Sequence, residues 1–200
     1  MDQDTFVATF DGEPGYLDWA AFGPLSPSVR SEVRAAAELL GSGRRAAMDL
    51  VSGHVLEARE LLAELLDADP EQVLLQPSST YGLMHAIYGM AGGLMLSRAE
   101  FPSLTVAATR AADALGAIDI QWLEPVDGFV TPEVVREAIT DDTRALAVSL
   151  VDFRTGYRAD LTALREVIGD RLLIVDVMQA FGAVEADYAA ADVVCGNGYK

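Results

Sequence analysis

The sequence has 200 residues, of which 51% are hydrophobic and 22% are charged. This composition is enough to fill one substantial core, and it excludes a largely disordered chain. Acidic residues number 31 against 14 lysines and arginines, which gives a net charge of -17. Such a charge repels nucleic acid phosphates and anionic bilayers, so we expect neither nucleic acid nor membrane as a partner.

The first residues are acidic and polar rather than basic and then apolar, so they do not have the pattern of a secretory signal. No stretch approaches the ~18 uninterrupted apolar residues that a membrane-spanning helix needs. Cys195 is the single cysteine, which excludes an internal disulfide. We therefore expect a cytoplasmic protein.

The first half of the sequence predicts an irregular segment followed by two helices. Residues 1–25 mix glycine and proline with apolar residues and have no helical period, which is typical of an ordered, irregular arm. Helical spacing of apolar residues predicts a helix from Ser28 to about Val51, interrupted near residues 41–43. A second helix is expected from about His54 to Leu66, before Asp69 and Pro70.

From residue 73 onward, strand-like and helical patterns alternate. The predicted strands span 73–76, 94–97, 118–123, 145–151, 172–176 and 192–195, and the predicted helices span 80–90, 104–115, 131–139 and 161–168. This alternation predicts an α/β fold of three layers, α/β/α, with a mainly parallel sheet. Ligands bind beyond the carboxyl ends of the strands in such sheets, so polar residues at those positions are the candidates for chemistry.

Two candidates follow predicted strands. Asp176 ends the apolar run 172–175, where a carboxylate needs a partner, although it could simply cap the turn at Met178. Lys200 follows a glycine-bearing turn after the last strand, and a lone lysine there is usually solvated. As a pair they are more specific, because a lysine amine forms an imine with an aldehyde cofactor while a carboxylate keeps a pyridine nitrogen protonated.

A third candidate is the hydroxyl-rich turn Ser78–Thr80, between a predicted strand and a predicted helix. Free N–H groups and hydroxyls at a helix start suit a phosphate, whereas simple N-capping is the alternative. Together with Asp176 and Lys200, the turn favours a phosphorylated cofactor.

Five motifs in order resemble fold-type I pyridoxal phosphate enzymes, and most closely the class V aminotransferase and cysteine desulfurase group. They lie at residues 18–24, 77–80, 100–103, 175–179 and 196–200. The resemblance covers nearly the whole chain. It implies an arm of residues 1–25 near the active site and a cofactor-binding large domain of residues 26–200. Family members continue well past the lysine, so we expect this domain to be incomplete, truncated after the Schiff-base lysine.

The resemblance also implies site residues. Lys200 holds pyridoxal phosphate as a Schiff base, Asp176 faces the pyridine nitrogen, and Gln179 bonds to the phenolic oxygen. The positions that match the phosphate contacts and the stacking ring are Ser79, Thr80, Asn197, Tyr199 and Phe101. Phe101 could instead be a core residue. Asn197 replaces a serine common in desulfurases, and residues 151–156 lack the paired asparagines and the glutamate of that group.

The implied function is that of a homodimeric enzyme acting on an amino acid, with amino-group transfer to an oxo acid as the leading interpretation. Cysteine desulfurase or selenocysteine lyase, kynureninase-like lyase and epimerase chemistry are alternatives on the same fold. A desulfurase needs a nucleophilic cysteine on a mobile loop well beyond the lysine, and Cys195, in an apolar strand, should be buried and inert. A non-catalytic binding or assembly module is the alternative of a different class.

Other polar residues carry weaker indications. His54 and His85 lie in no pattern of metal ligands, so no metal site is expected. Arg154 and Arg158 could bind a substrate carboxylate, although an arginine in a surface loop is more often only solvated.

Overall fold

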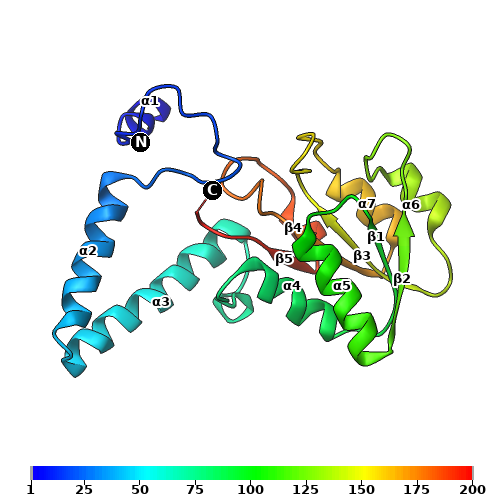
Figure 1. Cartoon of the computed structure of the whole chain (residues 1–200), viewed down its shortest axis with the longest axis horizontal. Helices are drawn as coiled ribbons and strands as arrows, with labels where there is room; N and C mark the ends of the chain where they lie inside the picture. The colour runs from blue at the N-terminus through cyan, green and yellow to red at the C-terminus, as the bar shows by residue number, and fades with distance from the viewer. Residues whose placement is uncertain (1, 200) are drawn as a thin grey trace. The chain divides into compact units, whose positions relative to one another are not determined.

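A computed structural model describes residues 2–199, and Lys200, the predicted Schiff-base lysine, lies outside the described residues. The chain divides into two compact units, one formed by residues up to Leu75 together with Tyr199, the other by Gln76–Gly198 (Figure 1). Our division into an arm of residues 1–25 and a domain of residues 26–200 stays a prediction.

The first unit is helical. Its elements are α1 (Gln3–Val7), α2 (Pro27–Gly41), α3 (Arg45–Leu66) and the 3-10 helix η1 (Pro70–Gln72). Ser26 caps α2 by accepting a hydrogen bond from the N–H of Val29, and Gly43 adopts a left-handed φ of 61° in the turn before α3. Residues 8–26 have no regular structure, so the predicted irregular arm holds apart from α1.

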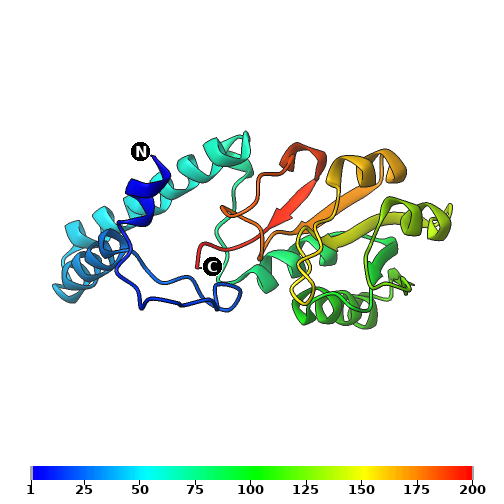
Figure 2. The same ribbon diagram turned by 90° about the horizontal axis from the view of Figure 1, so that it is seen from above.

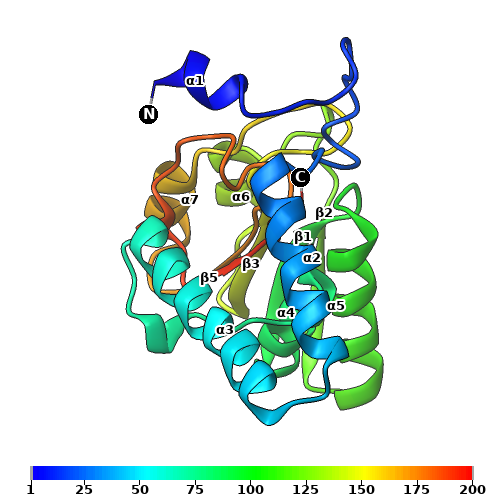
Figure 3. The same cartoon turned by 90° about the vertical axis from the view of Figure 1, so that its left-hand side faces the viewer.

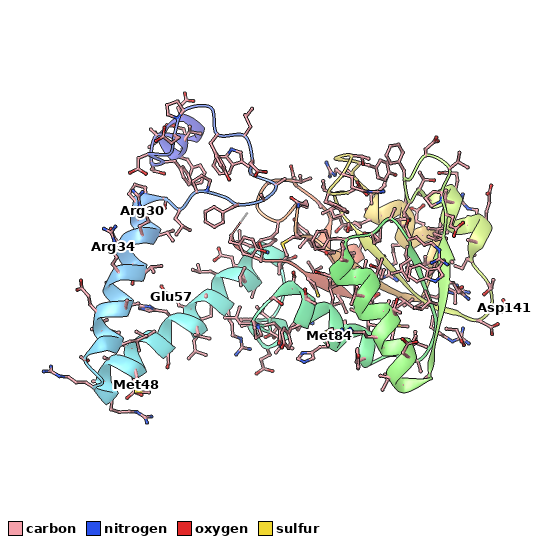
Figure 4. All side chains as sticks on the ribbon, viewed as in Figure 1. Arg30, Arg34, Met48, Glu57, Met84 and Asp141 are labelled. Carbon is pink, nitrogen blue, oxygen red and sulfur yellow. The ribbon has the colours of Figure 1, made fainter. Side chains whose placement is uncertain are left out.

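The predicted boundary between the two long helices is wrong. The chain breaks at residues 42–44, as the glycine pair Gly41 and Gly43 indicated, but residues 45–51 belong to α3. Gly53 lies inside this helix, because an isolated glycine weakens a helix by only about 1 kcal/mol. Apolar side chains remain exposed along this helix, among them Met48 (Figure 4), and its buried residues are Ala47 and Ala63.

The strand predicted at residues 73–76 is absent from the structure. These residues form a connection without ladder pairing. Leu74 and Leu75 are exposed, while the carbonyl of Val73 accepts a hydrogen bond from Nε of Arg59 at 2.9 Å. A short apolar run resembles a buried strand by pattern alone, and here a side chain takes up the backbone acceptor in place of a neighbouring strand.

The second unit contains a five-stranded sheet in which all pairs are parallel. Its strands are β1 (Gly92–Ser97), β2 (Ile118–Leu123), β3 (Thr143–Ser149), β4 (Leu172–Asp176) and β5 (Val193–Cys195), in the spatial order β2-β1-β3-β4-β5. The order reverses between β1 and β3, which is the point where ligands bind in open parallel sheets. The predicted fold class is therefore confirmed.

Helices cover both faces of this sheet (Figures 2 and 3). One face packs against α4 (Ser79–Tyr88) and α5 (Pro102–Leu115), and the other packs against α6 (Pro132–Ala138) and α7 (Leu161–Ile168). Successive strand residues alternate between the two cores, as Ala145 and Ala147 do on one face and Leu146 and Val148 on the other. Strands buried on both sides read as continuous apolar runs, which is why the sequence predicts them well.

The edge of the sheet where the strands begin, here called the amino edge, carries a hydrogen-bond network of neutral and cationic side chains. The hydroxyl of buried Thr143 donates to Gln121 at 2.6 Å, and the Gln121 amide donates to Thr140 at 3.1 Å. The Arg171 guanidinium donates to the carbonyls of Thr143 (2.9 Å), Ile168 (3.1 Å) and Thr140 (3.3 Å). This network provides hydrogen-bond partners for backbone carbonyls and side chains near the start of β3.

Candidate cofactor site at the carboxyl edge of the sheet

The opposite edge, here called the carboxyl edge, places three predicted strand ends side by side. Ser149 of β3 pairs with Asp176 of β4, and Asp176 pairs with Cys195 of β5. The N–H of Leu150 donates to the Asp176 carbonyl and the N–H of Val177 donates to the Cys195 carbonyl, so the pairing continues past the strands. The side chains of these residues therefore come from neighbouring points of one edge.

Asp176 is buried at this edge, with 4% of its surface exposed. One carboxylate oxygen accepts a hydrogen bond from the N–H of Met178 at 2.8 Å, which is the turn-capping role that the sequence left open. A carboxylate has two oxygens and room for several donors, so this cap is compatible with a second partner. The apolar run before Asp176 thus delivers a carboxylate into a site with little solvent.

The start of α4 carries the predicted phosphate residues. Ser78 is the N-cap and accepts from the N–H of Tyr81, while Ser79 is buried and begins the helix. The Thr80 hydroxyl pairs with the Ser103 hydroxyl at 2.8 Å, which joins the starts of α4 and α5. Capping of the helix therefore explains Ser78 only. The two residues assigned to phosphate, Ser79 and Thr80, are not the capping residue.

Phe101 lies directly before α5 and is 39% exposed, so the alternative of a core residue is wrong. Its ring meets the ring of Phe153 edge to face, with centroids 5.1 Å apart and planes at 89°. Such geometry is the favoured one for aromatic pairs and fixes the plane of each ring. A partly exposed, oriented ring is what a stacking residue requires.

Glu100 connects the β1–α5 loop to the end of β3. Its carboxylate accepts from the Ser149 hydroxyl at 2.5 Å and from the Ser149 N–H at 3.2 Å. Burial raises the pKa of Glu100, and the nearby charges of Asp176 and Asp152 raise it further, against the opposing effect of the two Ser149 hydrogen bonds. Glu100 and Ser149 also line a small cleft beyond the carboxyl ends of β1 and β3, together with Ser97, Asp152, Arg154 and Tyr157.

The loop after β3 holds Asp152 and the two arginines considered for substrate binding. Burial by itself raises the pKa of Asp152, but hydrogen bonds from Arg154 and Thr155 outweigh burial and hold that pKa below its ordinary value. The Arg154 guanidinium lies 2.8 Å from Asp152, and Arg158 donates to the Glu185 carbonyl at 2.5 Å. Both arginines therefore have partners within the chain.

The segments after β4 and β5 carry the other predicted contacts. Gln179 is half-buried in the turn that follows β4. The Asn197 amide donates to the sulfur of Met178, which joins the segment after β5 to that turn. A Cβ on Gly196 would lie 2.7 Å from Cγ2 of Val177, so any larger residue there would have to displace that side chain. Tyr199 belongs to the first unit, where its carbonyl accepts a hydrogen bond from the N–H of Gly23 at 2.8 Å.

Cys195 is buried, as predicted. Burial and the charge of Asp176 raise the pKa of its thiol to about 11. A Cβ on Gly82 would lie 3.3 Å from its sulfur, so α4 packs closely over it. A buried thiol with such a pKa forms little thiolate, so Cys195 is a packing residue.

Comparison with known proteins assigns the chain to a family. Residues 16–197 match the family described as Aminotransferase class-V. The chain belongs to this family. The resemblance that the five motifs indicated is thus confirmed, and the family is one of pyridoxal phosphate-dependent enzymes.

Named relatives and solved structures agree with this assignment. The cysteine desulfurase IscS of Ectopseudomonas mendocina is 32% identical over 190 residues, which cover 87% of this chain and 46% of that protein. The IscS of Pseudomonas syringae pv. tomato is 30% identical over 196 residues, which cover 90% of this chain and 48% of that protein. The chain therefore spans about half the length of the curated relatives it matches.

Two solved structures show the same fold. A C-DES variant with glycine covalently linked to its PLP cofactor matches with a TM-score of 0.84 at 19% identity, over 100% of this chain and 56% of that one. The cysteine desulfurase CsdA of Escherichia coli matches with a TM-score of 0.75 at 22% identity, over 100% of this chain and 55% of that one. At these identities the likeness concerns the fold, which is that of fold-type I enzymes.

Sequence reasoning found Asp176, Ser79, Thr80 and Phe101, which the structure places at or near the carboxyl edge, but it gave no role to Glu100 or Ser149. Both follow the rule that selected Asp176, since each is a polar residue at or just after a strand end. Within residues 2–199, no group of three or more histidine, cysteine, aspartate or glutamate side chains could hold a metal ion. Likewise, no helix in this range is long and apolar enough to cross a membrane.

Proposed function

We propose that this chain is the cofactor-binding part of a pyridoxal phosphate-dependent enzyme that acts on an amino acid, and that it cleaves the carbon–sulfur bond of cysteine. The observation that carries the proposal is the carboxyl edge, where a buried carboxylate, a hydroxyl-bearing helix start and an exposed aromatic ring belong to connected segments. The named relatives are cysteine desulfurases, which supports a sulfur-containing substrate.

The residues present fit pyridoxal phosphate. Asp176 offers a desolvated negative charge, which would hold the proton on the pyridine nitrogen. Ser79, Thr80 and the free N–H groups at the start of α4 offer donors to a phosphate. When bound, the cofactor supplies a ring that takes up the electron pair released when a bond at the substrate α-carbon breaks.

Lys200 is the residue that would attach the cofactor. Its amine would bond to the cofactor's aldehyde carbon and, once displaced by the substrate's amine, would hold or move a proton at the substrate α-carbon. Lys200 is the only lysine in the sequence, because the other thirteen of the 14 basic residues are arginines. Within this chain, the amino terminus is the sole competing amine.

Amino-group transfer is a second candidate, and Phe101 favours it. The family resemblance implies histidine at this position in desulfurases and phenylalanine in kynureninase-like members, and a phenyl ring can neither donate nor accept a proton. Cleavage that depends on proton delivery from residue 101 would therefore be lost, whereas a transfer that uses the Lys200 amine would remain. Kynureninase-like, selenocysteine lyase and epimerase reactions remain alternatives, because they use the same cofactor on the same fold.

Cofactor attachment is tested by reconstitution. The purified protein, mixed with pyridoxal phosphate, should become yellow and should lose the colour on borohydride reduction, leaving a pyridoxyl group on the peptide that contains Lys200. The K200R variant should stay colourless, since an arginine does not form the bond at neutral pH. A wild-type protein that takes up no cofactor would instead support the non-catalytic module.

The reaction is identified by its products. Offered cysteine and an added thiol as sulfur acceptor, because Cys195 is buried, the loaded protein should form alanine and the persulfide of that thiol in equal amounts if the leading proposal holds. If the amino acid is instead converted to its oxo acid, and only when an amino-group acceptor is added, the reaction is amino-group transfer. An inverted stereocentre would indicate an epimerase. The family also leads us to propose a homodimer, which sedimentation of the purified protein would test, and the cytoplasmic location stays a prediction.

A further inference from the structure

The contact between Glu100 and Ser149 joins residues 49 positions apart. Glu100 lies in the four-residue connection between β1 and α5, and Ser149 is the last residue of β3. These strands are neighbours at the point where the strand order reverses. The carboxylate of Glu100 accepts both donors of Ser149, so the connection is fixed to the sheet at two points rather than one.

This contact lies within a longer series of residues, which are joined partly by hydrogen bonds, partly along the chain and partly by strand pairing. On one side, the residue after Glu100 is Phe101, and two residues later the Ser103 hydroxyl pairs with Thr80 at the start of α4. On the other side, Ser149 pairs with Asp176 across the sheet. The series therefore runs from the hydroxyls assigned to the phosphate, past the stacking ring, to the carboxylate assigned to the pyridine nitrogen.

The charges around Glu100 are mostly negative. Asp176 on β4 and Asp152 after β3 both act on its carboxyl group, and Arg154 is the nearby cation, itself engaged by Asp152. On its own connection, Arg98 pairs with exposed Glu124. The starts of α4 and α5 carry the neutral hydroxyls of Thr80 and Ser103, which bond to each other. Glu100 thus adds to a field that favours a cation at the carboxyl edge.

We propose that Glu100 is a positioning residue for the cofactor, which sets the place of the Phe101 ring through Ser149 and adds negative charge that stabilises the protonated cofactor. This role rests on the proposed function. It assigns Glu100 two separable effects: a geometric one, carried by the two hydrogen bonds to Ser149, and an electrostatic one, carried by the charge alone.

Glu100→Gln separates the two effects. The amide oxygen of glutamine can accept from the Ser149 N–H and its NH2 group can donate to the Ser149 oxygen, so the geometry is retained while the charge is removed. Glu100→Ala removes both. Glu124→Gln is the matched control, because Glu124 is an exposed acid whose partner, Arg98, lies on the same connection.

The experiment measures cofactor affinity and the pH midpoint of the visible absorbance of the bound cofactor. Removing a nearby negative charge disfavours the protonated form, so E100Q should move the midpoint to lower pH by roughly half a unit and change affinity little. E100A should move it similarly and weaken affinity roughly tenfold, as the loss of two hydrogen bonds at the connection predicts. E124Q should match the wild type in both.

Two results would overturn the proposal: an unchanged midpoint in E100Q, or an E100A protein that binds cofactor as tightly as the wild type. If E100A fails to fold, E100Q and Ser149→Ala, which removes one donor, still test the two effects. A wild-type protein that binds no cofactor would defeat the proposed function itself, and the two failures are therefore distinguishable.

Discussion

The two edges of the sheet in the second unit are built from different chemistry. The amino edge uses neutral side chains and the guanidinium of Arg171, and its carboxylate Asp192 is neutralised by an ion pair with Arg165. The carboxyl edge gathers the carboxylates Glu100, Asp152 and Asp176 near one another. Like charges in a partly buried place raise one another's pKa and cost stability. The difference fits an amino edge that serves the fold and a carboxyl edge that, in the proposed function, faces the protonated ring of the cofactor.

The largest expected effect comes from Asp176→Asn. The amide oxygen can still accept from the N–H of Met178, so the turn and the fold should persist. Without the negative charge the pyridine nitrogen loses its proton, and the rate of substrate turnover should fall about a hundredfold or more. Turnover would be measured at saturating cofactor, with circular dichroism to verify the fold. An active D176N protein would remove the main reason for assigning the site to this edge.

Arg171→Ala tests the amino edge. Its guanidinium donates to three backbone carbonyls, so the free energy of unfolding should fall by about 2 kcal/mol. Urea unfolding measures this change, while the absorbance midpoint of bound cofactor should stay where it is. Arg136→Ala is the control, because Arg136 has only a distant ion pair with Glu133, at 3.9 Å. Weakened cofactor binding in R171A with normal stability would contradict the division between the edges.

A smaller effect is expected in the pH dependence of stability. The pKa of Glu100 is raised above its ordinary value of 4.5 by burial and by the neighbouring acids. The folded protein therefore keeps this proton at pH values where the unfolded chain has released it. The stabilisation is complete below pH 4.5 and is lost as pH rises through the raised value.

E100Q has no carboxyl group to titrate at this position. As the pH rises from 4.5 through the raised pKa, the free energy of unfolding of the wild type should therefore fall relative to that of E100Q. Cofactor-free protein, unfolded in urea at several pH values, provides the measurement. If the difference between the two proteins stays constant with pH, the pKa of Glu100 is the same in the folded and unfolded states, which would contradict this prediction.

The smallest effect concerns Cys195. With a pKa of about 11, roughly one thiol in a thousand is ionised at pH 8, so alkylation by iodoacetamide should be at least about a hundredfold slower in the native protein than in denaturant. Cys195→Ala should leave cofactor affinity unchanged. Rapid labelling of the native protein would show that this strand opens readily at the carboxyl edge.

The sequence predicts the second unit well for a physical reason. Helix α7 and strands β2 and β4 have the bounds that the pattern indicates, because their apolar residues are buried in continuous cores. Residues 73–76 have the same kind of pattern but no neighbouring strand, and pattern alone does not say which backbone groups find partners. The same limit explains why Asp176 is found from sequence and the Glu100–Ser149 contact, across 49 residues, is not.

Gly196 limits what can follow β5. A Cβ there would lie 2.7 Å from Cγ2 of Val177, the residue directly after Asp176, so the segment leaving β5 packs against the turn after β4 through that one methyl group. A larger residue at position 196 would have to displace the Val177 side chain, and a smaller residue at position 177 would make room for it. The spacing of the two segments is thus set jointly by these two positions, and a change at one can be matched by a change at the other.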